Sequence, residues 1–273
     1  MQQTLSEIRT AAKRDLLGKW WKAILLFLFF SLFCFTFNLL ILQNGDIGWI
    51  TMVAFSLFIG LPLGWGYLVS FLTNSREIES PFAFSHLLVG FKDYLRITIT
   101  LCIRELYILF WMLVLLVPYI ILITFIMGGI GFEEIGVLID GYLNDNFYMA
   151  LGWIDESCGD FADYILGICF SIPFIIMLLP GLILSIIKSL SYSMTPYILY
   201  DYKDLKYNGA IELSMKMMDG HKKQLLCLYL SFIGWGVVCL MTLCIGFLWL
   251  NPYINASLTR FYEQMKDEYE QKR

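Results

Sequence analysis

The chain has 273 residues, of which 59% are hydrophobic and only 15% are charged. A typical soluble domain has about 45–50% apolar and about 25% charged residues, so a soluble globule could not bury this much apolar surface. The apolar residues also gather into runs of the roughly 20 residues that a helix needs to cross a membrane. The composition therefore excludes a soluble protein and predicts an all-α, polytopic helical membrane protein with a single membrane domain over residues 1–273.

Six apolar segments are predicted to be transmembrane helices. They cover residues 20–42, 50–72, 101–127, 165–190, 225–242 and 247–261. Basic residues precede the first segment, but it is much longer than the roughly 7–15 apolar residues of a signal peptide, so we expect it to remain as a signal anchor. All cysteines except Cys158 lie in apolar runs, which argues against a disulfide framework.

The positions of the basic residues predict the orientation of these segments. Of the 19 lysines and arginines, all except Arg104 and Lys188 lie near the termini or beside alternate connections. The complementary connections, at 43–49, 128–164 and the turn near 244–246, contain none. Since positively charged loops stay on the cytoplasmic side, we expect a multi-pass protein of the bacterial cytoplasmic (inner) membrane with both termini in the cytoplasm.

The long external connection, residues 128–164, is acidic. Its apolar residues recur at helical spacing, which predicts an amphipathic helix on the outer membrane interface. Its carboxylates raise the alternative of a calcium site, but their spacing does not match an EF-hand loop, and no metal ligand is assigned. Cys158 lies in this segment, and the sequence assigns it no role.

Three junctions along the chain share one pattern. The segments LLGKWWKAILLF, LLVGFKDYL and MMDGHKKQLLCLYLSFIGW each pass from a short amphipathic stretch through a glycine to basic and aromatic residues. The glycines are Gly18, Gly90 and Gly220. Because glycine can adopt the left-handed conformation that ends a helix, each is predicted to form a structural corner between a surface helix and a spanning helix.

The repeated junction predicts three helical-hairpin units, residues 1–79, 80–201 and 202–273. Each unit has a cytoplasmic amphipathic helix before its first span, and the first such helix should begin with a capping box from Thr4 to Glu7. The alternative is that glycine and lysine simply mark helix ends, as they do in any helical membrane protein.

The C-terminal third of the chain resembles a known family. The segments AIELSMKMMDGHKKQLLCLYLSFIGW and LWLNPYINASLTRFY are similar to the bacterial membrane family known as domain of unknown function 975. The matching residues include Gly220, His221, Lys222, Gly246, Trp249, Pro252, Tyr253 and Tyr262, with Ser193, Pro196, Tyr197 and Ala210 upstream. The family has no established activity, so the resemblance implies a fold and a topology only.

Charges inside the predicted spans mark the candidate ligand-binding residues, because a charge at mid-bilayer costs about 2.5–3.5 kcal/mol. They are Arg104 and Glu105 in the third span and Lys188 in the fourth. All three lie about 18 Å from the cytoplasmic corner at about 1.5 Å per residue. We therefore predict that Glu105 pairs with Lys188 and that Arg104 is left to bind a phosphate or carboxylate. The alternative is that Arg104 and Glu105 lie near the cytoplasmic surface and that Lys188 snorkels.

The sequence contains no P-loop and no HExxH, GxSxG, CxxC or dinucleotide motif, and no catalytic residue is assigned. We expect a non-enzymatic protein with no cofactor, no metal and no nucleic-acid partner. The expected role is structural or accessory, in organising membrane lipid or another membrane protein. The alternative is a transporter or exporter of a small or lipid-like anionic molecule, because internal repeats and interrupted helices are typical of secondary transporters. An intramembrane enzyme would need a nucleophile and a base at one depth, which the sequence does not provide.

Overall fold

The structure is a computed structural model that describes residues 4–42, 48–76, 82–114, 117, 176, 179–205 and 207–272, and every regular element among them is helical. The elements are α1 (Leu5–Leu16), α2 (Trp20–Leu42), α3 (Gly48–Phe55), the π-helix η2 (Ser56–Gly60), α4 (Leu61–Arg76), the 3₁₀ helix η3 (Phe84–Phe91), α5 (Tyr94–Leu113), α10 (Thr195–Asp201), α11 (Asn208–Met217), α12 (Lys222–Met241) and α13 (Phe247–Gln271). The all-α prediction is confirmed for this part of the chain. The chain divides into two compact units, Met1–Leu106 with Ser189–Arg273, and Tyr107–Lys188.

Several described helices are long and apolar enough to cross a membrane. The four candidates are Trp20–Leu39, Ile50–Arg76, Leu179–Asp201 and Lys222–Met241. The predicted spans 101–127 and 165–190 extend beyond the described residues, and the acidic segment 128–164 with Cys158 lies outside them. Helix α13, which contains the predicted sixth span, is not among the four candidates. The described residues thus have the pattern of a multi-pass membrane protein, with fewer candidate spans than the six predicted.

Helix α1 starts as its sequence predicts. The Glu7 N–H donates to Thr4 Oγ1 at 3.4 Å, and the Thr4 N–H donates to Glu7 Oε2 at 2.8 Å, which completes a capping box. The apolar face of α1, formed by Ile8, Ala12 and Leu16, is buried in the core of the first unit. Helix α1 therefore packs on the rest of the protein through the face that its amphipathic sequence defines.

The three glycines predicted to form corners have different surroundings. Gly18, between α1 and α2, has φ +74°, and Gly220, between α11 and α12, has φ +81°. A Cβ at either position would have no neighbour within 4 Å, so the backbone conformation alone favours glycine there. Gly90 lies within η3 without a positive φ, and a Cβ there would lie 2.3 Å from the Pro62 carbonyl oxygen. Its role is a close approach of η3 to α4 rather than a left-handed corner.

The second predicted span is interrupted at a proline. Pro62 has no N–H, and its ring would collide with the carbonyl group of Phe58 in a regular α-helix. The chain instead forms η2, in which the Leu61 N–H bonds to the Ser56 carbonyl oxygen five residues earlier. Such a π-turn widens the helix locally and forms the irregular junction between α3 and α4.

The core of the first unit lies where α4, α10 and α13 meet. The Trp65 indole N–H on α4 donates to the Pro196 carbonyl oxygen of α10 at 2.7 Å. Tyr197 on α10 stacks on Tyr262 of α13, with 5.0 Å between ring centroids. These helices come from the three returning segments of the predicted repeat units, and they pack together although Trp65 and Pro196 are 131 residues apart in the chain.

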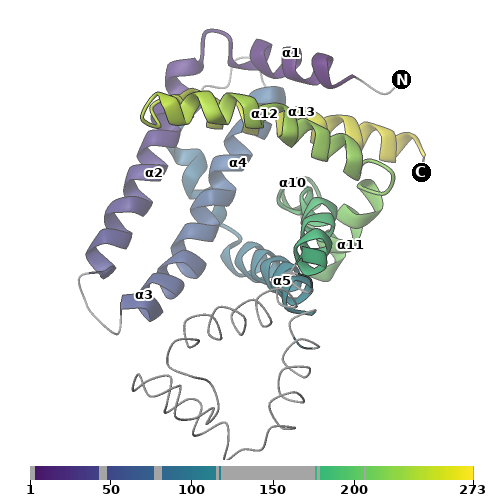
Figure 1. The fold of residues 1–273 in the computed structure, drawn as a ribbon, viewed down its shortest axis with the longest axis horizontal. Coiled ribbons are helices and arrows are strands. Elements are labelled where there is room, and N and C mark those ends of the chain that lie inside the picture. The colour runs from purple at the N-terminus through teal and green to yellow at the C-terminus, as the bar shows by residue number, and fades with distance from the viewer. Residues whose placement is uncertain are drawn as a thin grey trace, which may run out of the picture. The chain divides into compact units, whose positions relative to one another are not determined.

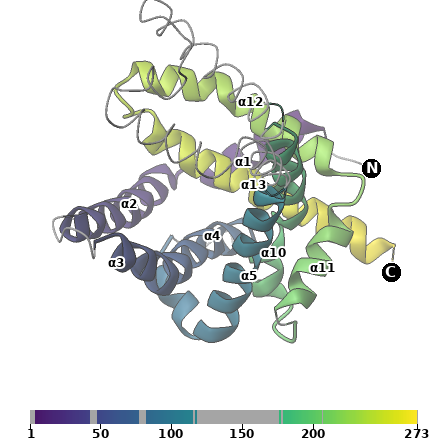
Figure 2. The same cartoon turned by 60° about the horizontal axis from the view of Figure 1, so that its bottom comes forward.

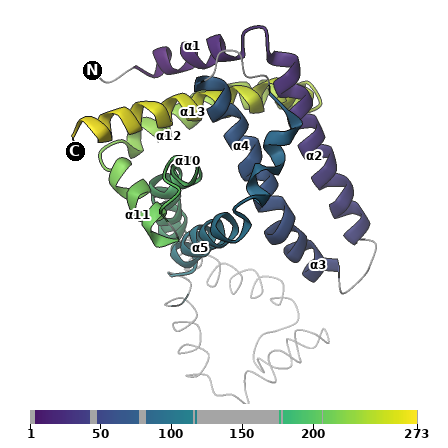
Figure 3. The same ribbon diagram turned by 180° about the vertical axis from the view of Figure 1, so that it is seen from behind.

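A layer of three helices runs along one side of the first unit. Helices α12 and α13 form a hairpin, and α1 lies against α13 (Figures 1 and 2). Helices α2 and α4 run away from this layer, as the view from behind also shows (Figure 3). Close to the hairpin turn, the rings of Trp21 on α2 and Trp249 on α13 are in edge contact at 6.3 Å. We refer to α1, α12 and α13 as the hairpin layer.

Candidate functional site

The predicted ligand-binding residues have partners nearby in sequence or within their own unit. On α5, the Arg104 Nε donates to Glu105 Oε1 at 3.1 Å, and Glu105 is the more exposed of the two. In the second unit, Lys188 Nζ lies 4.3 Å from the centroid of the Trp111 ring, a cation–π contact. Glu105 and Lys188 belong to different units, and the contact between them remains a prediction.

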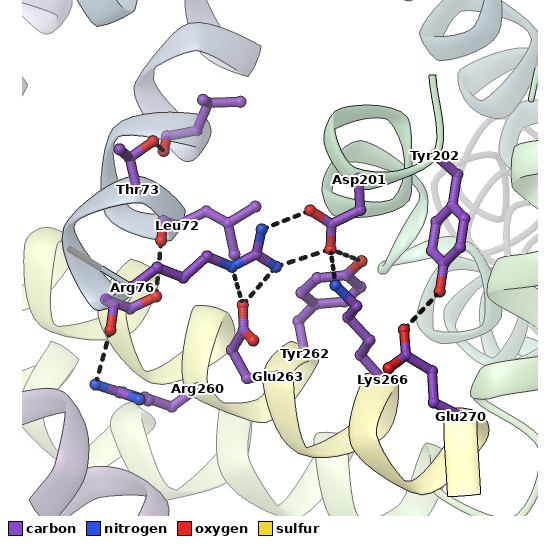
Figure 4. Close-up of polar contacts among 12 residues, drawn as sticks. Leu72, Thr73, Arg76, Asp201, Tyr202, Arg260, Tyr262, Glu263, Lys266 and Glu270 are labelled. Carbon is purple, nitrogen blue, oxygen red and sulfur yellow. Dashed lines mark hydrogen bonds and ion pairs between the residues drawn. The ribbon is translucent and has the colours of Figure 1, made fainter. Parts of the chain in front are cut away.

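A cluster of charged side chains lies at the junction of α4, α10 and α13. Asp201, the last residue of α10, accepts hydrogen bonds from both terminal nitrogens of Arg76 at 2.6 and 2.7 Å. It also accepts from the Tyr262 hydroxyl at 2.8 Å and from Lys266 Nζ at 2.9 Å (Figure 4). Arg76 Nε donates to Glu263 at 2.9 Å. We call these five residues the Asp201 cluster.

The Asp201 cluster is paired in charge and largely removed from water. The side chain of Asp201 is only 6% exposed, whereas that of Arg76 is 30% exposed. Burial raises the pKa of Tyr262, and the adjacent Asp201 raises it further, so the hydroxyl stays protonated as a donor. Both carboxylate oxygens of Asp201 accept hydrogen bonds, which suits a residue that holds helices together better than a catalytic base.

A second set of contacts ties α1 to α4 and α13. Arg260 on α13 forms an ion pair with Asp15 of α1, and its guanidinium also donates to the Ser75 carbonyl oxygen at 3.2 Å. Asn74 on α4 donates to the Asp15 carbonyl oxygen at 3.1 Å and accepts from Lys19 at 2.9 Å. The amphipathic N-terminal helix is thereby joined to the end of α4 and to the middle of α13 by side chains that fix its position.

A pocket of about 340 Å³ opens beside the hairpin layer. Its walls include the aromatic side chains Trp20, Trp235, Trp249 and Tyr253, and Arg9 and Lys13 of α1 line it as well. We call it the aromatic pocket. No aspartate or glutamate is among the residues that line it, so its charged groups are both cationic.

Sequence reasoning missed both the Asp201 cluster and the aromatic pocket. Arg76, Arg260 and Lys266 were interpreted only as basic residues that mark the cytoplasmic side, and Asp201 was not considered. One signal was available, because each returning segment has a charged residue close to its cytoplasmic end: Arg76, Asp201 and Arg260. Among the described residues, no group of three or more histidine, cysteine, aspartate or glutamate side chains could hold a metal ion.

Comparison with known protein families identifies the family of the chain. The model of the family described as "Protein of unknown function (DUF975)" matches residues 1–269. The chain belongs to this family. The match covers nearly the whole of this DUF975 protein, including its N-terminal helix. It therefore extends well beyond the C-terminal third on which the resemblance was based. No curated protein and no solved structure matches the chain.

Proposed function

We propose that this protein is a non-enzymatic component of the bacterial cytoplasmic membrane that organises membrane lipid or a partner membrane protein, without a cofactor and without nucleic acid. The observation that carries the proposal is the hairpin layer. The Asp15–Arg260 ion pair joins its amphipathic N-terminal helix to α13 of the hairpin, and the Lys266–Asp201 ion pair ties α13 to the end of α10.

The contact between Trp21 and Trp249 supports a specific position for the hairpin. If α12 and α13 were the fifth and sixth spans, Trp249 would lie near the external surface. Trp21, at the start of the first span, would lie near the cytoplasmic surface. A hydrocarbon core about 30 Å thick would separate them, but their rings are in contact at 6.3 Å. We therefore propose that α12 and α13 lie in the cytoplasmic leaflet rather than cross the membrane.

The surface of α12 is compatible with this position. Helix α12 is long and apolar enough to span, but length and composition do not distinguish a spanning helix from one that lies within a leaflet. Met241, the last residue of α12, and Leu243 in the turn are 81% and 87% exposed, and Ile233 and Val237 on α12 are also exposed. These side chains would be buried among acyl chains, as in a monotopic helical hairpin.

The Asp201 cluster supports a structural role over transport. Alternating access requires one hairpin unit to move against another. The cluster and the Asp15–Arg260 pair connect the ends of α1, α4 and α10 to α13 through partly buried ion pairs, which such a movement would have to break. The π-turn in the second span is the feature that favours the transporter alternative, because interrupted helices are common in transporters.

A flux measurement distinguishes the two roles. Protein reconstituted into sealed vesicles should not raise the uptake of radiolabelled phosphate, or the flipping of fluorescent short-chain phosphatidylglycerol, above that of protein-free vesicles under an imposed proton or sodium gradient. Protein-dependent, gradient-driven movement of either anion would contradict the structural role and favour the transporter.

A further inference from the structure

The aromatic pocket combines apolar aromatic walls with two cationic side chains. Trp235 on α12 and Trp249 on α13 form apolar walls, and their side chains are 55% and 43% exposed. Arg9 and Lys13, four residues apart on α1, line the same pocket. Residues at this spacing share one face of a helix, so both cations reach the pocket from the same direction.

The two cations have an aromatic partner in place of an acidic one. Arg9 Nε donates to the Tyr253 hydroxyl at 3.3 Å, and Lys13 Nζ lies 5.6 Å from the centroid of the Tyr253 ring. Within the part of the chain that the structure describes, neither has an ion pair with a carboxylate. In contrast, Arg76, Arg260 and Lys266 in the same unit all face carboxylates. The pocket therefore has a surplus of positive charge beside a low-dielectric wall, where an anion is bound strongly.

We propose that the aromatic pocket binds one anionic phospholipid of the cytoplasmic leaflet. The phosphate would lie between Arg9 and Lys13, and an acyl chain would lie along Trp235, Val238 and Trp249 towards the hairpin turn. The apolar walls favour a lipid over a free phosphate ion, because a small anion would leave them without a partner. The position beside an amphipathic helix fits this ligand, since each basic residue near an anionic membrane surface adds attraction. This inference rests on the proposed position of the hairpin in the cytoplasmic leaflet, and it specifies the class of lipid that the protein binds.

Lipid binding by native mass spectrometry tests the proposal. The purified full-length protein in detergent is titrated with phosphatidylglycerol, with phosphatidylcholine, and with phosphatidylglycerol in the presence of millimolar inorganic phosphate. We expect one phosphatidylglycerol to bind at least about tenfold more tightly than phosphatidylcholine, and inorganic phosphate not to displace it. Equal affinity for the two lipids would overturn the proposal. Displacement by inorganic phosphate would instead indicate a site for a soluble anion.

Substitutions locate the site. The double variant Arg9→Gln, Lys13→Gln should lose about tenfold or more in phosphatidylglycerol affinity. A matched control, Arg14→Gln with Lys216→Gln, removes the same charge from exposed positions outside the pocket and should change the affinity less than twofold. Equal losses in the two variants would show general charge attraction and contradict a pocket.

Two further results keep the test decisive. If the double variant does not fold, Val238→Trp offers a second approach, because it fills the apolar part of the pocket at a half-exposed position and leaves both cations in place. It should also lower phosphatidylglycerol affinity about tenfold, and unchanged affinity would overturn the proposed acyl position. If the protein shows neither selective lipid binding nor anion flux, the lipid site is wrong but the structural role stands. Gradient-driven anion flux would contradict the structural role, whatever the lipid affinity.

Discussion

Replacement of Asp201 by asparagine is expected to lower the free energy of unfolding by about 3 kcal/mol. The change removes the negative charge that Arg76 and Lys266 share, and it leaves both cations beside a buried amide. Breaking a buried ion pair from one side costs about 3–5 kcal/mol. We expect the lower end of that range, because the Arg76 side chain is 30% exposed and water partly replaces its lost partner. Thermal unfolding of the purified protein in detergent measures the effect.

Asp93→Asn is the matched control for this substitution. Asp93 also pairs with an arginine, Arg96 at 3.4 Å, but its side chain is 56% exposed, so its loss should cost only about 0–1 kcal/mol. Adding Lys266→Met to Asp201→Asn removes one unpaired cation and should restore part of the stability. Equal effects of Asp201→Asn and Asp93→Asn, with no such recovery, would mean that the Asp201 cluster does not hold the helices together.

The second large effect is expected at Gly90, where alanine should destabilise the protein by about 3 kcal/mol. The added Cβ would lie 2.3 Å from the Pro62 carbonyl oxygen and 2.9 Å from its carbonyl carbon. Both are backbone atoms next to the π-turn, so no side chain can rotate to make room, and η3 must move away from α4. Overpacking of this kind costs about 1–3 kcal/mol and sometimes more.

Gly236→Ala provides the comparison at a helical glycine without neighbours. Gly236 lies inside α12, and a Cβ there would have no neighbour within 4 Å. Alanine should therefore stabilise α12 by up to about 1 kcal/mol, because glycine is a poor helix former. Thermal unfolding should show a lower stability for Gly90→Ala and a higher stability for Gly236→Ala. If Gly90→Ala is as stable as Gly236→Ala, η3 does not pack on α4 as closely as described.

Features that depend on a few neighbouring residues could be predicted from the sequence. The helical membrane fold follows from composition and apolar run length, and the Thr4–Glu7 capping box was recognisable from its spacing. Gly18 and Gly220 have the positive φ that a glycine after an amphipathic helix suggests. Gly90 has the same sequence surroundings, but its role depends on Pro62, a contact between separate elements that no local pattern contains.

Features that depend on distant contacts could not be predicted. Arg76 lies 125 residues before Asp201 in the chain. The sequence therefore indicates on which side of the membrane Arg76 lies, but not that it pairs with Asp201. Similarly, the apolar sequence of α12 fits a spanning helix and a helix within one leaflet equally well, because both bury apolar side chains in lipid. Only the contact of Trp21 with Trp249 separates these two positions.

Labelling of Cys244 from each side of the membrane tests the position of the hairpin most directly. Cys244 lies in the exposed turn between α12 and α13, and Cys158 lies in the acidic segment predicted to be external. Two variants, each retaining only one of these cysteines, are treated with a membrane-impermeant maleimide in right-side-out and in inside-out vesicles. We predict that Cys158 reacts only in right-side-out vesicles and that Cys244 does not react there, but reacts in inside-out vesicles or after detergent solubilisation. Reaction of Cys244 from the same side as Cys158 would mean that α12 and α13 cross the membrane, and it would contradict the proposed hairpin in the cytoplasmic leaflet.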